Sequence, residues 1–408
     1  MGNAKSIRNN NYSVAMKKLI YISLCASLVF CSCEKSPVAD NPGSKDNEII
    51  VPSGEYIHFN TEALTRGSLI NGGTLQDKFD VIGYRYASDW VAFRPQAKPN
   101  VFPRTVGNTT YDHVETINYN TVGGYHDYTD PVEWTADKYA FFAYYPSSGT
   151  ENVTIDASFS TYEGTPYVDY TLNVADITKH KDVMTACVKD THKQASKQGV
   201  NLTMQHRLSA LDFVGYSYVD AKAVNELSKD YPGWTNIPED TPVEIIIDEL
   251  TVTLENLAYN KVRISLDKSE DLNQLTEEIE AMIPSNTNNS TSYEFTYVSE
   301  SQDPFMFENG VTTILSQTLN EDMENGCPMI LIPQNTELTC YVDIIYRIKA
   351  GDLYSNNEYS VQDSIKITNG LAEGVYSYIL IGFTKTGIHL KVEQSALWNE
   401  INVDHQFE

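Results

Sequence analysis

One stretch of the chain, Val243-Glu244-Ile245-Ile246-Ile247, consists almost entirely of residues that favour β-strands. Similar short runs recur between clusters of Gly, Asn, Asp and Pro, with hardly any helical pattern between them. These runs are Val81–Tyr86, Tyr139–Tyr145, Tyr167–Leu172, Leu211–Tyr218, Glu244–Leu254, Met329–Ile332, Tyr341–Ile348 and Tyr376–Phe383. Regular strand spacing without intervening helices predicts an all-β fold made of β-sandwiches.

One segment of the C-terminal half has a helical period instead. Its apolar residues follow a 3-4-3 spacing, at Leu272, Leu275, Ile279 and Met282. Asp267 stands three residues before Glu270, which is the arrangement of a capping pair at a helix start. We therefore expect a short helix here that packs over one sandwich.

The chain has 408 residues, with 29 Lys plus Arg against 55 Asp plus Glu and a formal net charge of -26. This acidity argues against nucleic-acid binding, because phosphate contacts need clustered Lys and Arg. Hydrophobic residues make up 41% and charged residues 21%, which is a globular composition. The length allows two or three domains with a well-buried core.

The N-terminal residues predict export. An apolar run from Leu19 to Phe30 follows Lys17-Lys18, too short to span a membrane as a stable helix but typical of a signal peptide. Either Met1 or Met16 can be the start. The small residue Ser32 directly before Cys33 resembles the lipobox of bacterial lipoproteins, so residues 1–32 are predicted to be removed and Cys33 acylated. An ordinary signal peptide cut nearby is the alternative.

The remaining cysteines predict neither a disulfide framework nor a metal site. They are Cys187, Cys327 and Cys340, without a CxxC or CxxH spacing. Cys327 and Cys340 can pair across a hairpin, but buried free thiols are the favoured interpretation.

The sequence also lacks the usual signatures of an enzyme. It has no HExxH, GxSxG, P-loop or GxGxxG motif, so we predict no catalytic residue, metal or cofactor. His206 precedes an apolar strand and is predicted to be a structural hydrogen-bonding residue.

Two aromatic residues are candidates for ligand contact. Tyr231 and Trp234 lie in a turn-like stretch with Pro232-Gly233, where an exposed aromatic ring would be an interaction site. The other tryptophans, Trp90, Trp134 and Trp398, adjoin strand-like runs and are predicted to lie in or near the core.

A strand with alternating character stands near the start of the exported chain. Its more apolar face carries Ile57, Phe59, Thr61 and Ala63. A sandwich that lacks an edge strand exposes an apolar groove and unpaired backbone groups, which a strand from another molecule can fill. Residues 56–64 are thus a candidate removable plug, and a cut between Arg66 and Gly67 would open the groove. The alternative is an ordinary strand that stays in its own fold.

The C-terminus carries a second such strand. Its more apolar positions are Ile401, Val403, His405 and Phe407. This segment is the candidate donor strand for a neighbouring molecule, with an internal strand as the alternative. At about 3.3 Å per residue it reaches only some 23 Å, which is short for a donor.

Several further motifs occur in a fixed order along the exported chain. They are Cys33, Thr65-Arg66, Phe79-Asp80-Val81-Ile82-Gly83-Tyr84, Trp134, Tyr139-Ala140-Phe141-Phe142-Ala143-Tyr144-Tyr145-Pro146, Met204-Gln205-His206-Arg207-Leu208-Ser209-Ala210-Leu211-Asp212-Phe213, Met329-Ile330-Leu331-Ile332-Pro333-Gln334, Gly374-Val375-Tyr376-Ser377-Tyr378 and Trp398. With this order the chain resembles the fimbrillin family, the type V pilins of Bacteroidetes and their minor fimbrial relatives.

The resemblance implies two transthyretin-like β-sandwich domains, a lipidated precursor, cleavage by an Arg-specific protease and polymerisation by strand exchange. The expected division is a signal peptide at 1–32, a tether and removable strand at 33–66, and sandwiches at 67–200 and 201–408. The cell outer membrane and the fimbrium are the expected locations, and other fimbrial subunits and a host protein or glycan receptor are the expected partners.

Two functions thus remain open from the sequence. The first is a structural and adhesive fimbrial subunit in a stalk or tip position. The alternative is a surface lipoprotein that binds glycans for an uptake system, for which Trp234 would supply the stacking ring.

Overall fold

The structure is a computed structural model in which β-strands dominate. It describes residues 55–63, 75–94, 97, 99–102, 104–106, 109–111, 114–121, 125–148, 154–159, 166–173, 180–196, 199–229, 235–267, 282–285, 292–298, 305–308, 310, 313–314 and 328–395. Each of the eight runs predicted as strands coincides with a strand, and three of them extend one residue beyond its end, at Leu172, Tyr218 and Ile332. The all-β fold is confirmed. The number of domains stays a prediction.

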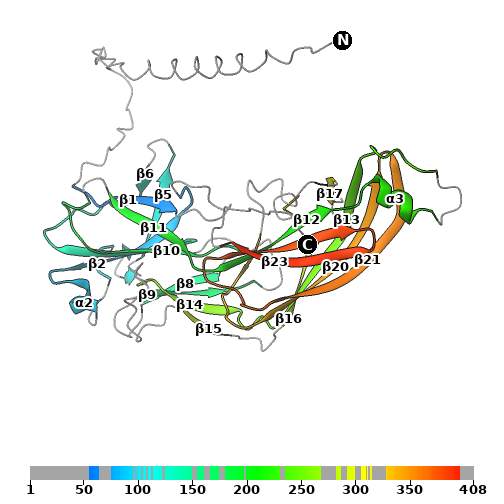
Figure 1. Cartoon of the computed structure of the whole chain (residues 1–408). Helices are drawn as coiled ribbons and strands as arrows, with labels where there is room; N and C mark the ends of the chain where they lie inside the picture. Colours follow the sequence, from blue (N-terminus) through cyan, green and yellow to red (C-terminus); the bar gives the residue numbers. More distant parts are fainter. Residues whose placement is uncertain are drawn as a thin grey trace, which may run out of the picture. The chain divides into compact units, whose positions relative to one another are not determined.

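Seven strands form a closed barrel in the order β1-β11-β10-β7-β2-β5-β6 (Figure 1). Their bounds are β1 (Phe59–Ala63), β2 (Phe79–Tyr86), β5 (Val114–Asn120), β6 (Tyr125–Asp127), β7 (Lys138–Tyr145), β10 (Met184–Thr191) and β11 (Val200–His206). β1 lies parallel to β11, in register from Phe59↔Val200 to Ala63↔Met204. On its other side it meets β6 at the single pair Phe59↔His126, which closes the barrel.

Strand β7 is buried on both faces, because its alternate residues enter two different clusters. Tyr139, Phe141 and Ala143 face one cluster with Phe59 of β1. Ala140, Phe142 and Tyr144 belong to the other, together with residues of β9 such as Tyr170. The unbroken apolar run of β7 therefore reflects a strand at the centre of the packing.

A four-stranded antiparallel sheet has the order β15-β14-β9-β8. Its strands are β8 (Thr154–Phe159), β9 (Pro166–Thr171), β14 (Lys261–Ser265) and β15 (Met282–Ser285). Arg263 of β14 forms two hydrogen bonds with Asp169 of β9, at 2.7 and 2.8 Å. The sheet thus takes strands from both sides of residue 200, where the sequence analysis divides the two sandwiches.

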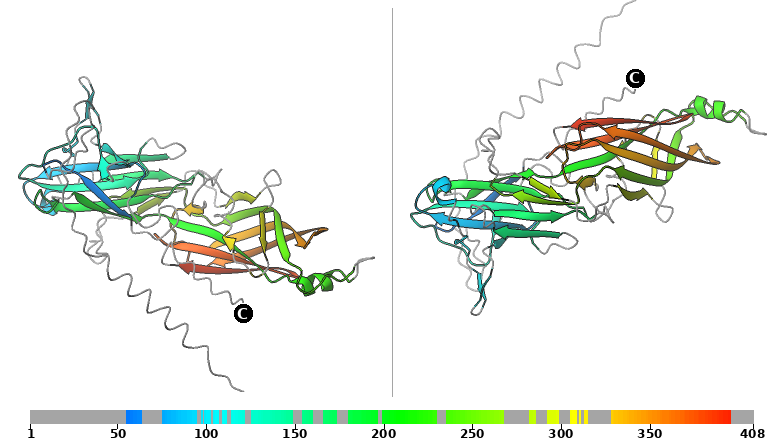
Figure 2. Two further views of the ribbon diagram at one scale, coloured as in Figure 1. Left: turned by 90° about the horizontal axis from the view of Figure 1, so that it is seen from above. Right: turned by 90° about the horizontal axis from the view of Figure 1, so that it is seen from below.

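Two five-stranded sheets make up most of the C-terminal half. One contains β12 (Ser209–Ser217), β18 (Thr313–Ile314), β19 (Met329–Leu331), β22 (Tyr376–Thr384) and β23 (Gly387–Ser395). The other contains β13 (Val243–Glu255), β16 (Ser292–Val298), β17 (Phe305–Glu308), β20 (Leu338–Ala350) and β21 (Leu353–Ile367). The long strands β20 and β21 run side by side as an antiparallel pair in both views of Figure 2.

Strand β20 shows why this half folds as packed sheets. Every second residue from Leu338 to Ala350 is buried, and the residues between are half-buried. One face thus packs into the core, as strict alternation in a strand requires.

A separate hairpin pairs β3 (Arg104–Val106) with β4 (Thr109–Tyr111).

Two short helices complete the described part, α2 (Trp90–Phe93) and α3 (Ala221–Leu227). Each begins after an Asp whose side chain accepts a backbone N–H, Asp89 from Ala92 and Asp220 from Ala223. Neither of these helices has the length and the apolar character that a crossing of the membrane requires.

The helix predicted around residues 272–282 needs a correction at its end. Met282, the last residue of the 3-4-3 spacing, belongs to strand β15 and pairs with Ile264. Leu272, Leu275 and Ile279 lie outside the described residues. The reason for the error is that four apolar positions over eleven residues are too few to separate a helix from the start of a strand. Helix α3 is the helix described in this half.

Candidate functional site

The candidate site is the slot that strand β1 fills between β11 and β6. Ile57 and Phe59 are completely buried, and Thr61 is 3% exposed. Tyr56, His58 and Asn60, at the alternate positions, are half-buried. The segment therefore inserts one face into the barrel, and Ala63 belongs to the same strand.

The ring of Phe59 lies in an aromatic pocket. It packs edge-on against Phe141, with ring centroids 5.2 Å apart. Tyr128 and Phe102 approach it with tilted rings, at 6.2 and 6.3 Å. Edge-on and tilted contacts of this kind add to the free energy gained by burying the ring.

The backbone around Ile57 is held from the side opposite β11. The Ile57 N–H donates to the Val132 carbonyl at 2.8 Å, and the Trp134 N–H donates to the Glu55 carbonyl at 2.9 Å. The Tyr128 hydroxyl donates to the Ile57 carbonyl at 2.9 Å. Residues 132–134 thus act as a second edge beside the plug segment.

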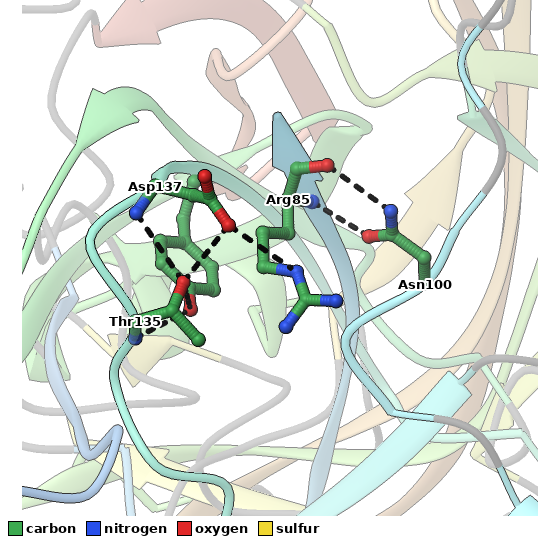
Figure 3. A network of polar contacts seen from close by, with 5 residues as sticks. Arg85, Asn100, Thr135 and Asp137 are labelled. Carbon is green, nitrogen blue, oxygen red and sulfur yellow. Dashed lines mark hydrogen bonds and ion pairs between the residues drawn. The ribbon is translucent and has the colours of Figure 1, made fainter. Parts of the chain in front are cut away.

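The chain directly after this second edge takes part in a polar network that also includes Arg85 and Asn100 (Figure 3). The Thr135 hydroxyl donates to Asp137 Oδ2 at 3.0 Å, and that oxygen lies 3.7 Å from Arg85 Nε. Asn100 accepts the Arg85 N–H at 2.6 Å and donates to the Arg85 carbonyl at 3.0 Å. None of these residues belongs to β1, so the network beside the edge does not depend on β1 for these contacts.

Thr61 occupies a polar pocket at the far end of the slot. Its hydroxyl oxygen accepts the Leu75 backbone N–H at 3.0 Å and lies 3.5 Å from His126 Nε2. The same Nε2 lies 2.7 Å from the Leu75 carbonyl oxygen. The slot therefore joins an aromatic pocket to a small polar one.

On the outward face of β1, Asn60 contacts the neighbouring strand β11. Its amide donates to Asn201 Oδ1 at 3.1 Å. Gly199 adopts a φ of +110°, and a Cβ atom there would stand 2.7 Å from Asn60 Nδ2. A side chain at residue 199 would therefore displace the Asn60 amide, and the positive φ itself favours glycine there.

Two histidines of the slot have altered acidity. Burial lowers the pKa of His58 and of His126. At His58 the charge of Asp127 opposes this shift, and at His126 hydrogen bonds to the backbone of Leu75 and Phe59 oppose it more than Asp127 does. Both ring nitrogens of His58 are buried and have no hydrogen-bond partner among the described residues. Protonating either ring therefore requires a charge in an unfavourable environment.

Most of the other predicted site residues lie outside the described residues. These are Cys33, Arg66, Gly67, Tyr231, Trp234, Ile401, Val403, His405 and Phe407. Their proposed roles stay predictions.

Sequence reasoning missed Leu75, His126 and Tyr128, which contact β1 from later in the chain. A partial signal exists for the last two, since Gly123-Gly124 is flanked by alternating residues and such a pattern predicts a hairpin. Leu75 carries no signal, because it contributes only backbone groups to the polar pocket.

Other residues singled out in the sequence have structural roles. The predicted hydrogen bond of His206 is confirmed, with Asp182 as its partner. Trp90 and Trp134 are buried as predicted. Cys340 is a buried free thiol whose pKa is raised by burial, and Cys327 lies outside the described residues. Within the described ranges, no three His, Cys, Asp or Glu residues gather to form a metal site.

Two of the solved structures that resemble this chain are proteins of Bacteroides. A fimbrial protein of Bacteroides vulgatus is 16% identical, covers 85% of this chain and 100% of its own, and has a TM-score of 0.50. A proposed cell adhesion protein of Bacteroides ovatus is 11% identical, with coverages of 83% and 97% and a TM-score of 0.41. The first of these shows that the fold is shared. No curated protein matches the chain.

The comparison with family models gives a more specific result. Residues 100–394 match the model of fimbrillin-like proteins. This range is well over half of the chain, and it includes most strands of the barrel and both five-stranded sheets. The chain belongs to the fimbrillin-like family.

Proposed function

We propose that this chain is a structural and adhesive subunit of a cell-surface fimbria. Proteins of the family are structural, and the chain is not an enzyme. The observation that carries the proposal is the position of β1, a short segment at the N-terminal side of the fold that supplies fully buried side chains to the barrel.

Removal of this segment would open an acceptor groove. Cleavage after Arg66 releases residues 33–66, whereas β11, β6 and residues 132–134 all follow the cut. Loss of Ile57 and Phe59 would leave apolar pockets lined by residues of β7 and β11, and loss of Thr61 would empty the polar pocket. The backbone groups of β11 along one edge would be unpaired. A strand from a neighbouring subunit would restore both the burial and the hydrogen bonds.

The rest of the proposal follows the expected maturation. The chain is exported, acylated at Cys33, carried to the outer membrane and cut between Arg66 and Gly67. Residues 401–407 serve as the strand that this subunit donates to another. Its partners are other fimbrial subunits and a receptor on the surface to which the fimbria adheres.

The test uses the chain from residue 34, an Arg-specific protease and size-exclusion chromatography. We expect one cut before Gly67, release of the fragment 34–66, and larger species once the other fimbrial subunits of the same cell are added. Arg66→Ala should stay uncut and monomeric, and a chain without residues 401–408 should fold but fail to donate a strand. Arg263→Ala, which removes an Arg whose side chain is 43% exposed, is the control that should behave as the wild type.

Resistance at Arg66, or assembly of the Arg66→Ala variant, would contradict the proposal. Unfolding of the chain that lacks residues 401–408 would show instead that the C-terminal strand is internal.

A further inference from the structure

We infer that the groove filled by β1 selects a strand from an unlike subunit, one with an aliphatic, an aromatic and a hydroxyl side chain at alternating positions, and does not accept the C-terminal strand of an identical copy. This inference rests on the proposed function, because it assumes that the groove is an acceptor. It adds which partner the groove takes.

The hydroxyl requirement comes from the polar pocket. The Leu75 N–H donates to Thr61 Oγ1 at 3.0 Å, beside the buried ring of His126. An apolar side chain at this position would leave a buried N–H without an acceptor, which costs more than the hydrogen bond itself contributes. Leu75 and His126 both follow Arg66 in the chain, so the pocket keeps this requirement after cleavage.

The aromatic requirement comes from the centre of the groove. Phe102, Tyr128 and Phe141 surround Phe59, and all three stay with the cut chain. A smaller side chain would leave a cavity between these rings, and protein cores lose stability in proportion to such cavities.

The position between the aromatic and the hydroxyl residue limits further which strands the groove can accept. Asn60 fits against Gly199 and bonds to Asn201. The close approach favours a short polar side chain there. The incoming strand thus has to match four positions of the groove, those that Ile57, Phe59, Asn60 and Thr61 occupy in the uncut chain.

The C-terminal strand of this chain does not meet these conditions. Residues 401–408 contain neither Ser nor Thr, so no register in either direction places a hydroxyl in the polar pocket. Placing Val403 or His405 in the aromatic pocket, in the direction of β1, puts His405 or Phe407 into the space of Thr61. The opposite face, with Asn402, Asp404 and Gln406, has no aromatic residue. The donated strand therefore fits a different subunit, and this subunit stands between unlike neighbours.

The experiment is a competition between peptides for one and the same protein, so no variant has to fold. The chain from residue 34 contains the whole compact unit Ile50–Glu408. It is cut after Arg66, urea is raised until the fragment 34–66 is removed, and the urea is then diluted in the presence of paired peptides. Native mass spectrometry gives the share of chains that carry each one.

The reference peptide spans residues 55–64. Its competitors are the same peptide with Thr61→Val, the same peptide with Thr61→Ser, and residues 399–408. We expect Thr61→Ser to compete within about threefold, Thr61→Val to be about tenfold weaker, and the C-terminal peptide to be at least about a hundredfold weaker. The cut chain alone should stay monomeric.

Three outcomes would overturn the selectivity while leaving the groove intact. The Thr61→Val peptide or the C-terminal peptide could be taken up as well as the reference peptide, or the pure cut chain could grow into fibres. Failure to take up any peptide, the reference included, would overturn the proposed function and the inference with it.

Discussion

The indole N–H of Trp90 donates to Asp267 Oδ2 at 2.8 Å, across 177 positions of the chain. The other carboxylate oxygen accepts from Lys189 Nζ at 2.8 Å, and Arg94 Nη1 lies 3.9 Å from Oδ2. The Asp267 side chain is only 3% exposed. One buried carboxylate thus ties together α2, β10 and the segment that follows β14.

Replacing this carboxylate should destabilise the protein strongly. Asp267→Ala leaves two nearby cations and an indole N–H without their acceptor, and breaking a buried ion pair in this way costs about 3–5 kcal/mol. Asp169→Ala is the matched control, because its partner Arg263 is 43% exposed and such pairs contribute about 1 kcal/mol or less. Urea unfolding measures both, and equal losses would contradict the central role of Asp267.

The loss of the Phe59 ring should matter only while the plug is present. Phe59→Ala removes a buried ring from an aromatic cluster, so the uncut chain should lose about 3–5 kcal/mol of unfolding free energy. After cleavage and release of residues 34–66, the variant and the wild type are the same molecule and should unfold identically. Phe141→Ala, which stays with the cut chain, should destabilise both forms. If Phe59→Ala leaves the unfolding free energy of the uncut chain unchanged, β1 does not bury this ring in solution.

Acid should weaken the uncut chain through the histidines of the slot. The pKa of His58 and of His126 is lowered on folding from the ordinary histidine value of 6.5. Below about pH 6.5 the unfolded chain therefore binds more protons at these two histidines than the folded chain does. Their contribution is therefore fully present above about pH 6.5 and is lost as the pH falls from 6.5 towards the folded-state pKa values. Unfolding free energies measured from pH 7.5 to 5 should show this decline.

The variant His58→Leu tests the origin of that decline. It should flatten the pH dependence and raise the stability at acidic pH, because two buried ring nitrogens without partners disappear. His389→Gln, on an exposed position of β23, should leave the slope unchanged. An unaltered slope in His58→Leu would assign the effect to other groups.

A methyl group at Gly199 should loosen the plug. Gly199→Ala combines a positive φ with a contact of 2.7 Å to Asn60, and strain of this kind costs about 1–3 kcal/mol. Gly387→Ala provides the control, since its φ is +145° but no atom lies within 4 Å of the added Cβ. In the double variant Gly199→Ala with Asn60→Ala, the stability lost through the side-chain contact should be recovered. Thermal unfolding of the two single glycine variants and of this double variant separates the cost of the contact from the cost of the positive φ.

The alternation of residues 56–61 could be read from the sequence because a strand with one buried face repeats every two residues. The partners of that strand could not. β11 follows β1 by about 140 residues, and the polar pocket of Thr61 depends on a backbone N–H that any residue at position 75 could supply. The sequence thus indicates that the segment is a strand, while its slot depends on pairing between distant segments.

For Asp267 the sequence pattern predicts a role that differs from the one in the structure. Its spacing to Glu270 follows a local rule for helix starts, but its two oxygens are occupied by groups from residues 90 and 189. Local patterns cannot report such contacts, because a buried acid and a capping acid are the same residue type in similar sequence surroundings.

Strand β11 ends at His206 and β12 begins at Ser209, so only Arg207 and Leu208 separate them. Arg207 is completely buried, its N–H donates to the Val183 carbonyl, and its guanidinium lies 2.6 Å from Glu373. A pull on a strand held by β11 would therefore travel along one short, anchored piece of backbone into β12. There the force would act along the parallel strand pair β12–β22, which extends from Ala210↔Tyr376 to Ser217↔Phe383. All the hydrogen bonds between these two strands would have to break together, so this connection is suited to carry tension between one end of a fibre and the other.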